Sequence, residues 1–134
     1  MTQQELNTRA VKHLLIVEDD QGLSNTLALE FADRGYQVSQ ISSATELSFP
    51  ETVVFDAALV DLKLKSESGL VIVEKLHRLY KDCRIVILTG YGSIATAVKA
   101  VKLGATNYLT KPASAAQIEA ALSAHCSGGC PQIM

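Results

Sequence analysis

The sequence contains no tryptophan, and with four tyrosines and three phenylalanines its aromatic content is only 5%. Hydrophobic residues still make up 48% of the chain, so the core must be built mainly from aliphatic side chains. Cysteine is also scarce, with only Cys83, Cys126 and Cys130. A sparse and odd number of cysteines excludes a small fold that depends on several disulfide bonds.

Neither sign of charge dominates, because 12 Lys and Arg residues face 14 Asp and Glu residues, for a net charge of −2. This balance gives no electrostatic basis for direct binding of nucleic acid or of a membrane by this chain. No apolar run is long enough to span a bilayer, and residues 1–12 are too polar for a secretory signal. We therefore expect a cytoplasmic protein, and 134 residues suit one domain.

Short aliphatic runs alternate with longer amphipathic segments along the chain. This alternation predicts an α/β fold with a doubly wound parallel sheet that is covered by helices on both faces. The weakest element is the helix at 43–48, because Pro50 follows it closely. The predicted strands are 13–17, 36–41, 57–60, 85–88 and 106–110, and the predicted helices are 21–34, 43–48, 69–80, 93–103 and one that begins at Ser114.

The predicted domain covers residues 12–124, with a flexible N-terminus at 1–11 and a flexible C-terminal tail at 125–134. The tail contains His125, Cys126 and Cys130 within six residues, a weak pattern for a metal site. We interpret these three side chains as incidental.

Polar side chains follow four of the five predicted strands. Ligands of open α/β sheets bind at the carboxyl ends of the strands, so these are the positions that carry information about function. Taken singly, each has an ordinary explanation: an acid after a strand is most often a helix N-cap or a solvated loop residue. The set is Glu18, Asp19 and Asp20 after the first strand, Asp61 after the third, Thr89 after the fourth and Lys111 after the fifth.

Together these side chains indicate phosphoryl transfer. Clustered carboxylates repel one another unless a cation neutralises them, and their oxygen ligands suit Mg²⁺. A carboxylate can attack a phosphoryl group to form an aspartyl phosphate, and the phosphoryl oxygens then need cations and a hydrogen-bond donor. Asp61 is the preferred nucleophile because it ends a buried strand, while Thr89 and Lys111 supply the hydroxyl and the ammonium.

From about residue 12 to residue 124 the sequence resembles the receiver domain of two-component response regulators. The resemblance rests on four ordered motifs, and it implies a flavodoxin-like fold with strand order 2-1-3-4-5. The motifs are Leu-Leu-Ile-Val-Glu18-Asp19-Asp20, Ala-Leu-Val-Asp61-Leu-Lys-Leu, Ile-Leu-Thr89-Gly-Tyr-Gly and Gly104-Ala-Thr-Asn-Tyr108-Leu-Thr-Lys111-Pro112.

The resemblance also implies residue roles. Asp61 would accept the phosphoryl group, and Thr89 and Lys111 would hold its oxygens. Mg²⁺ would be bound by Glu18, Asp19, Asp61 and the backbone carbonyl of Lys63. Thr89 and Tyr108 would form the switch, and the Lys111-Pro112 peptide bond would be cis.

Within the family, residues 88–106 are most similar to the redox-responsive RegA/PrrA-like regulators. We expect a sensor histidine kinase, or a small phosphodonor, to supply the phosphoryl group. Phosphorylation would change the surface formed by the fourth helix, fifth strand and fifth helix, and this surface would drive homodimer formation or expose a partner site. Those regulators carry a C-terminal helix-turn-helix domain, and this chain ends before one could begin. We therefore expect one of two arrangements. Either transcription is regulated through a domain outside the chain, or the protein is a stand-alone receiver. We also hypothesise that Tyr91, two residues after Thr89, slows hydrolysis of the aspartyl phosphate.

Three alternatives remain open. A flavodoxin-like nucleotide binder would need a phosphate-binding loop after the first strand, where Glu18, Asp19 and Asp20 would repel phosphate. An aspartyl phosphatase would place its nucleophile after the first strand rather than the third. A pseudo-receiver would serve as an interaction module without phosphorylation. The preferred interpretation is a signalling switch and not an enzyme.

Overall fold

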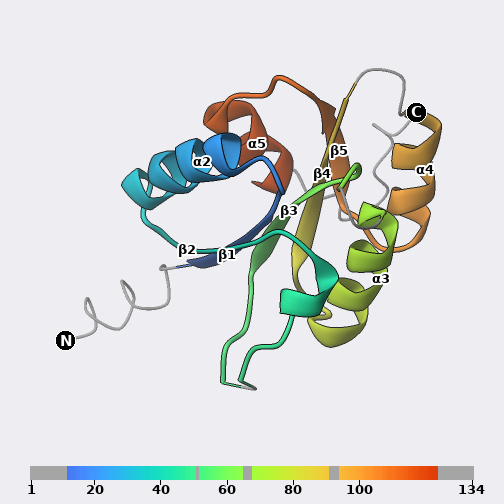
Figure 1. The fold of residues 1–134 in the computed structure, drawn as a ribbon, viewed down its shortest axis with the longest axis horizontal. Helices are drawn as coiled ribbons and strands as arrows, with labels where there is room; N and C mark the ends of the chain where they lie inside the picture. The colour runs from blue at the N-terminus through green and yellow to red at the C-terminus, as the bar shows by residue number, and fades with distance from the viewer. Residues whose placement is uncertain (1–11, 51, 65–67, 91–93, 124–134) are drawn as a thin grey trace.

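The computed structural model describes residues 12–50, 52–64, 68–90 and 94–123. Strands and helices alternate along these residues as the sequence pattern predicts (Figure 1). The strands are β1 (Lys12–Val17), β2 (Tyr36–Ile41), β3 (Ala57–Asp61), β4 (Arg84–Thr89) and β5 (Asn107–Thr110). The helices are α2 (Gln21–Asp33), α3 (Gly69–Leu79), α4 (Ile94–Lys102), α5 (Ala115–Ser123) and the 3₁₀ turn η1 (Ala44–Glu46).

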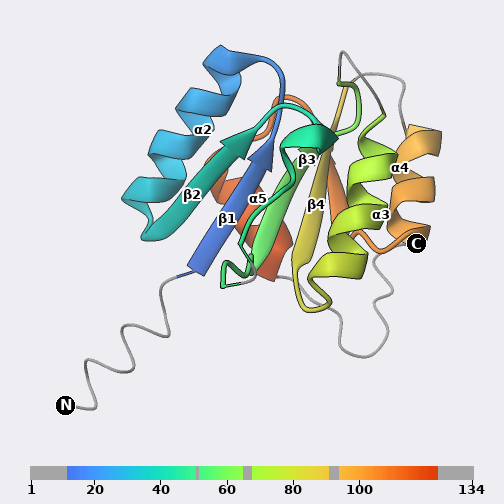
Figure 2. The same ribbon diagram turned by 60° about the horizontal axis from the view of Figure 1, so that its bottom comes forward.

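The strands form one sheet in the order β2-β1-β3-β4-β5, and every neighbouring pair is parallel. This confirms the predicted order. Figure 2 shows β2, β1, β3 and β4 side by side. The order reverses direction between β1 and β3, which are consecutive in space but not in sequence. In open α/β sheets this reversal point is where ligands bind.

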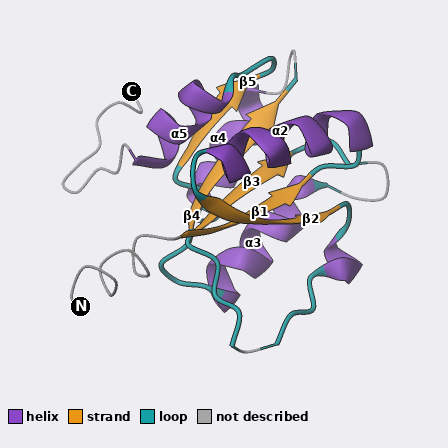
Figure 3. Cartoon of the chain, turned by 90° about the vertical axis from the view of Figure 1, so that its left-hand side faces the viewer, coloured by secondary structure: helices purple, strands orange, loops and turns teal. Residues whose placement is uncertain are grey.

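The two faces of the sheet carry separate, mainly aliphatic cores, because successive side chains of a strand point to opposite faces. Leu14 and Ile16 of β1 pack with α2 and α5, whereas Leu15 and Val17 pack with α3 and α4. Figures 1 and 3 show α2 and α3 on opposite sides of the sheet. The central strands β1, β3 and β4 are buried on both faces toward their carboxyl ends.

Local sequence signals set several helix ends. Asp20 is the N-cap of α2, and its carboxylate accepts a hydrogen bond from the Leu23 amide at 3.1 Å. Gly35, with φ of 96°, follows the helix as the sequence predicts. The predicted capping box of α5 is present: the Gln117 amide donates to Ser114 Oγ, and the Ser114 amide donates to Gln117 Oε1.

The predicted helix at 43–48 is wrong in type and length. The segment instead forms the 3₁₀ turn Ala44–Glu46. The Glu46 carboxylate accepts hydrogen bonds from the amide and hydroxyl of Ser42. The described residues between β2 and β3 therefore contain no α-helix, and Leu47, Phe49 and Val53 cover this part of the core instead. Asp61 is the last residue of β3 rather than the first residue after it.

None of the described helices combines the length and apolar character needed to cross a membrane. The predicted flexible segments at 1–11 and 125–134, with His125, Cys126 and Cys130, lie outside the described residues. Tyr91 also lies outside them.

Candidate functional site

The site is formed where the carboxyl ends of β1, β3 and β4 meet. The register pairs Val17 of β1 with Val60 of β3, and Asp61 of β3 with Leu88 of β4. Glu18, which follows Val17 directly, therefore comes beside Asp61, and Thr89 lies at the end of the next strand. The structure thus brings together Glu18 and Asp19 of the first motif with Asp61 of the second.

Glu18 is almost fully buried, with 3% of its surface exposed. Its backbone amide donates to the Ile41 carbonyl at 3.0 Å, so the hydrogen-bonding pattern between β1 and β2 extends to this residue. One carboxylate oxygen accepts from Lys111 Nζ at 3.2 Å, and the other accepts from the Asp20 amide at 3.2 Å. Both oxygens thus point into the site and have partners there.

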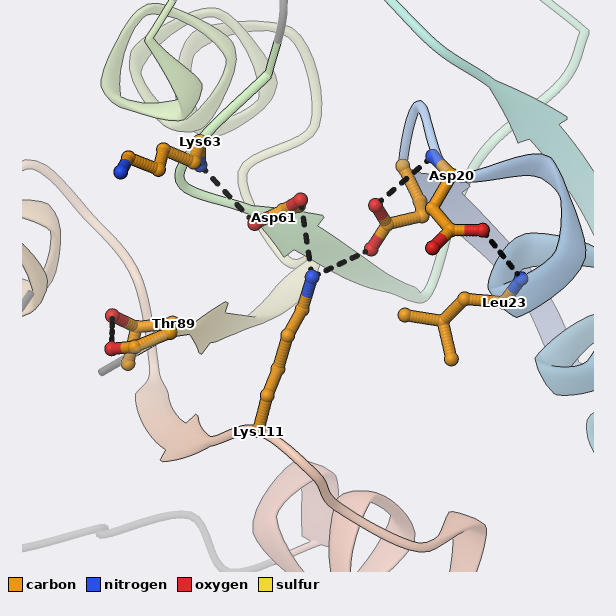
Figure 4. A network of polar contacts seen from close by, with 8 residues as sticks. Asp20, Leu23, Asp61, Lys63, Thr89 and Lys111 are labelled. Atoms are coloured by element: carbon orange, nitrogen blue, oxygen red, sulfur yellow. Dashed lines mark hydrogen bonds and ion pairs between the residues drawn. The ribbon is translucent and has the colours of Figure 1, made fainter.

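Lys111 joins the two buried acids. Its Nζ lies 3.2 Å from Glu18 Oε1 and 3.2 Å from Asp61 Oδ2. Asp61 is also buried, and its other oxygen accepts from the Lys63 amide at 3.1 Å. Figure 4 shows the Lys111 side chain reaching from the end of β5 to Asp61 at the centre of the site. The ammonium of Lys111 partly neutralises the two carboxylates.

The electrostatics follow from burial and from the closeness of like charges. Burial, with a hydrogen bond and charge repulsion from Asp61, raises the pKa of Glu18 to about 7. Burial alone would lower the pKa of Lys111, but the carboxylates of Asp61 and Glu18 outweigh it and raise that pKa. Lys111 therefore stays charged at neutral pH, whereas burial and Asp61 favour the protonated form of Glu18.

Three carboxylates could hold a metal ion. Glu18, Asp19 and Asp61 each offer an oxygen, and these oxygens lie within 4.8 Å of one another. Such a set of oxygen ligands suits a hard divalent cation. The raised pKa of Glu18 supports this fit, because a cation at this position would favour the ionised carboxylate that burial and Asp61 disfavour.

The structure shows no hydrogen bond from the Thr89 or Tyr108 side chain to the described carboxylates of the site. The Thr89 side chain is buried, and its hydroxyl donates to the Gly90 carbonyl at 3.1 Å, away from the carboxylates. The Lys111 amide donates to the Thr89 carbonyl at 2.9 Å, which ties these two residues together. Tyr108 is half-buried on β5 and packs against the core beneath α3 and α4. The predicted cis peptide bond between Lys111 and Pro112 is present.

Sequence reasoning missed two backbone contributions. The amides of Asp20 and Lys63 donate to Glu18 and Asp61, but a backbone donor leaves no trace in the choice of residue. The helix-cap explanation, weighed for the acids after the first strand, is right for Asp20. This leaves Glu18 and Asp19 as the acids that this strand contributes to the site.

The sequence model of the response regulator receiver domain matches residues 14–123. The chain belongs to this family. It is 45% identical over 116 residues to the photosynthetic apparatus regulatory protein RegA of Cereibacter sphaeroides, which covers 86% of this chain and 63% of that protein. It is 46% identical over 112 residues to the acid tolerance regulatory protein ActR of Rhizobium meliloti, which covers 83% and 58%. The receiver therefore spans less than two thirds of these relatives.

A solved structure of a Burkholderia pseudomallei response regulator superposes with a TM-score of 0.77 at 43% identity. The match covers 84% of this chain and 67% of that one. The Burkholderia structure is described as containing a phosphorylated aspartic acid, a calcium ion and citrate. The similarity to RegA confirms the subgroup that the sequence resembles.

Proposed function

We propose that this receiver accepts a phosphoryl group on Asp61 from a sensor histidine kinase or a small phosphodonor, with Mg²⁺ bound beside it. The observation that carries the proposal is the position of the Asp61 carboxylate. It is buried at the end of a central strand, within hydrogen-bonding distance of Lys111 and beside the other two acids. The phosphorylated aspartic acid in the Burkholderia relative gives independent support.

In the proposed step, an Asp61 oxygen forms a bond to phosphorus while the bond to the donor's nitrogen or oxygen breaks. The ammonium of Lys111 would pair with an oxygen of the transferred phosphoryl group, because it already contacts Asp61. The amide of Lys63 holds the other Asp61 oxygen and orients the carboxylate.

Glu18, Asp19, Asp61 and the Lys63 carbonyl would hold the Mg²⁺. When bound, it neutralises the acids and the negative oxygens of the transferred group. A site with only oxygen ligands can bind either Mg²⁺ or Ca²⁺. This is consistent with the calcium ion of the Burkholderia relative. Lys111 alone cannot balance three carboxylates and an added phosphoryl group.

The proposed output is a change in the surface made by α4, β5 and α5. Thr89 would leave the Gly90 carbonyl to donate its hydroxyl to the phosphoryl group, and Tyr108 would rotate into the space that Thr89 leaves. This makes the receiver a two-state element biased by a local charge change. On α4, Ile94 and Val98 are 45% and 42% exposed, which offers apolar area for a homodimer at this surface.

Transcription would then be regulated through a DNA-binding domain outside this chain, as expected from the resemblance to RegA/PrrA-like regulators. The receiver itself would act as a cytoplasmic switch rather than as an enzyme with turnover. Its balanced charge supports contact with proteins rather than with nucleic acid.

The test is incubation with acetyl phosphate and Mg²⁺, followed by intact-mass measurement, with Asp61→Asn as the control. The wild type should gain one phosphoryl group and the variant none, while both keep the same circular dichroism spectrum. A folded wild type that gains nothing from acetyl phosphate or from a histidine kinase would favour the pseudo-receiver. A gain by Asp61→Asn would place the acceptor elsewhere.

A further inference from the structure

Gly69, the first residue of α3, lies against the backbone of the residue proposed to accept the phosphoryl group. It is buried, and a Cβ atom built on it would lie 2.4 Å from the Asp61 carbonyl oxygen. The same atom would lie 2.8 Å from the Leu62 Cα and 3.1 Å from the Asp61 carbonyl carbon. All three contacts are with backbone, so no flexible side chain can move aside.

The surrounding hydrogen bonds fix this close approach from both sides. The Gly69 amide donates to the Leu62 carbonyl at 2.9 Å, and Lys63 pairs with Ser68 in an antiparallel bridge. On the other side, the Leu62 amide donates to the Leu88 carbonyl of β4 at 3.2 Å. The Leu62 side chain is 5% exposed and is packed in the core. The peptide between Asp61 and Leu62 is thus held between β4 and the start of α3.

We propose that Gly69 is a positioning residue for phosphoryl transfer. Its lack of a side chain sets the position of the Asp61-Leu62 peptide, and with it the Asp61 carboxylate and the carbonyl of Lys63. This inference rests on the proposed function, because it assigns Gly69 to the geometry of that reaction.

The size of the effect follows from the distances. Moving the Asp61 oxygen from 2.4 Å to 3.0 Å, below which real Cβ contacts essentially never occur, requires a shift of about 0.6 Å. Misplacing a reacting group by about 1 Å can cost about a hundredfold in rate. We therefore expect Gly69→Ala to slow phosphorylation about tenfold or more. The Lys63 carbonyl moves with the same segment, so a higher Mg²⁺ concentration should also be needed for half-maximal rate.

Two other glycines provide matched controls. In Gly22→Ala, in the first turn of α2 near the site, the new Cβ would lie 3.5 Å from Asp20 Oδ1, an ordinary contact. In Gly104→Ala, the new Cβ would lie 2.5 Å from His77 Cγ, at a residue with φ of +126°. Gly104 precedes β5, at the end of the sheet opposite the site, so this variant is destabilised without moving Asp61.

The experiment measures the acetyl phosphate reaction as a function of Mg²⁺, and Mg²⁺ binding by calorimetry, for the wild type and the three variants. All four proteins are measured with an added osmolyte that is excluded from protein surfaces, because it favours the folded state. Circular dichroism checks that each protein is folded. Gly69→Ala should react about tenfold or more slowly and bind Mg²⁺ more weakly. Gly22→Ala and Gly104→Ala should match the wild type in both measurements.

A folded Gly69→Ala with wild-type rate and affinity would overturn the inference. Equal slowing of Gly104→Ala would also overturn it, because the effect would then follow stability alone. If Gly69→Ala stays unfolded even in the osmolyte, Gly69 is required for folding rather than for the geometry of the site, which would also overturn the inference. A wild type that gains no phosphoryl group is a separate result, which refutes the proposed function itself.

Discussion

The buried acid Glu18 makes the stability of the metal-free receiver depend on pH in an unusual direction. Its pKa is raised from 4.5 to about 7, by burial first and by Asp61 second. Between these two pH values the folded chain binds more protons at Glu18 than the unfolded chain does. Stability therefore falls as pH rises through this interval, and the loss is complete only above about pH 7.

The magnitude follows from the same two values. The difference between 4.5 and about 7, at about 1.36 kcal/mol for each pH unit, corresponds to at most about 3 kcal/mol of unfolding free energy. Other groups also have raised pKa values, but their ordinary pKa values are 9.0 or above, so they titrate outside this window. These groups are Lys111, Tyr36, Tyr80 and Cys83.

The assay is urea unfolding from about pH 5 to about pH 8 in the presence of a chelator, for the wild type and Glu18→Gln. The wild type should become less stable as pH rises, whereas Glu18→Gln, which cannot ionise, should lose most of this dependence. Added Mg²⁺ should reverse the trend in the wild type, because the metal binds the ionised carboxylates. A flat wild-type profile, or an equal slope in Glu18→Gln, would refute the reasoning.

Further predictions concern the cation, a helix cap and phosphate lifetime. Lys111→Met leaves two buried acids without their ammonium, so we expect a loss of about 3 kcal/mol at pH 8 without metal, measured by urea unfolding, and less at pH 6 where Glu18 is protonated. Ser114→Ala removes the capping box of α5, and we expect a loss of about 1 kcal/mol in thermal unfolding with an unchanged rate of phosphorylation. Tyr91→Ala should shorten the lifetime of the aspartyl phosphate, followed by intact mass after removal of the donor; an unchanged lifetime would contradict that hypothesis.

Much of the fold could be predicted because it depends on short-range patterns. The buried runs before Glu18, Asp61 and Thr89 predict central strands, since such strands are apolar on both faces. Side-chain capping at Ser114 and the glycine after α2 have local chemical causes, and both are confirmed. The segment between β2 and β3 could not be predicted this way, because no strong periodicity decides between a helix and the 3₁₀ turn that forms there.

The sequence by itself determined which chemical groups follow the strands, because hydrophobic runs and the acids after them are contiguous along the chain. The strand order came from the resemblance to receivers rather than from periodicity. Only the tertiary structure decided that Asp20 caps a helix while Glu18 turns inward, and that Lys111 bridges Glu18 and Asp61. It alone brings Gly69 against the Asp61 carbonyl. These relations join residues through packing and backbone hydrogen bonds across the sheet, and neither residue type nor spacing along the chain encodes such distances.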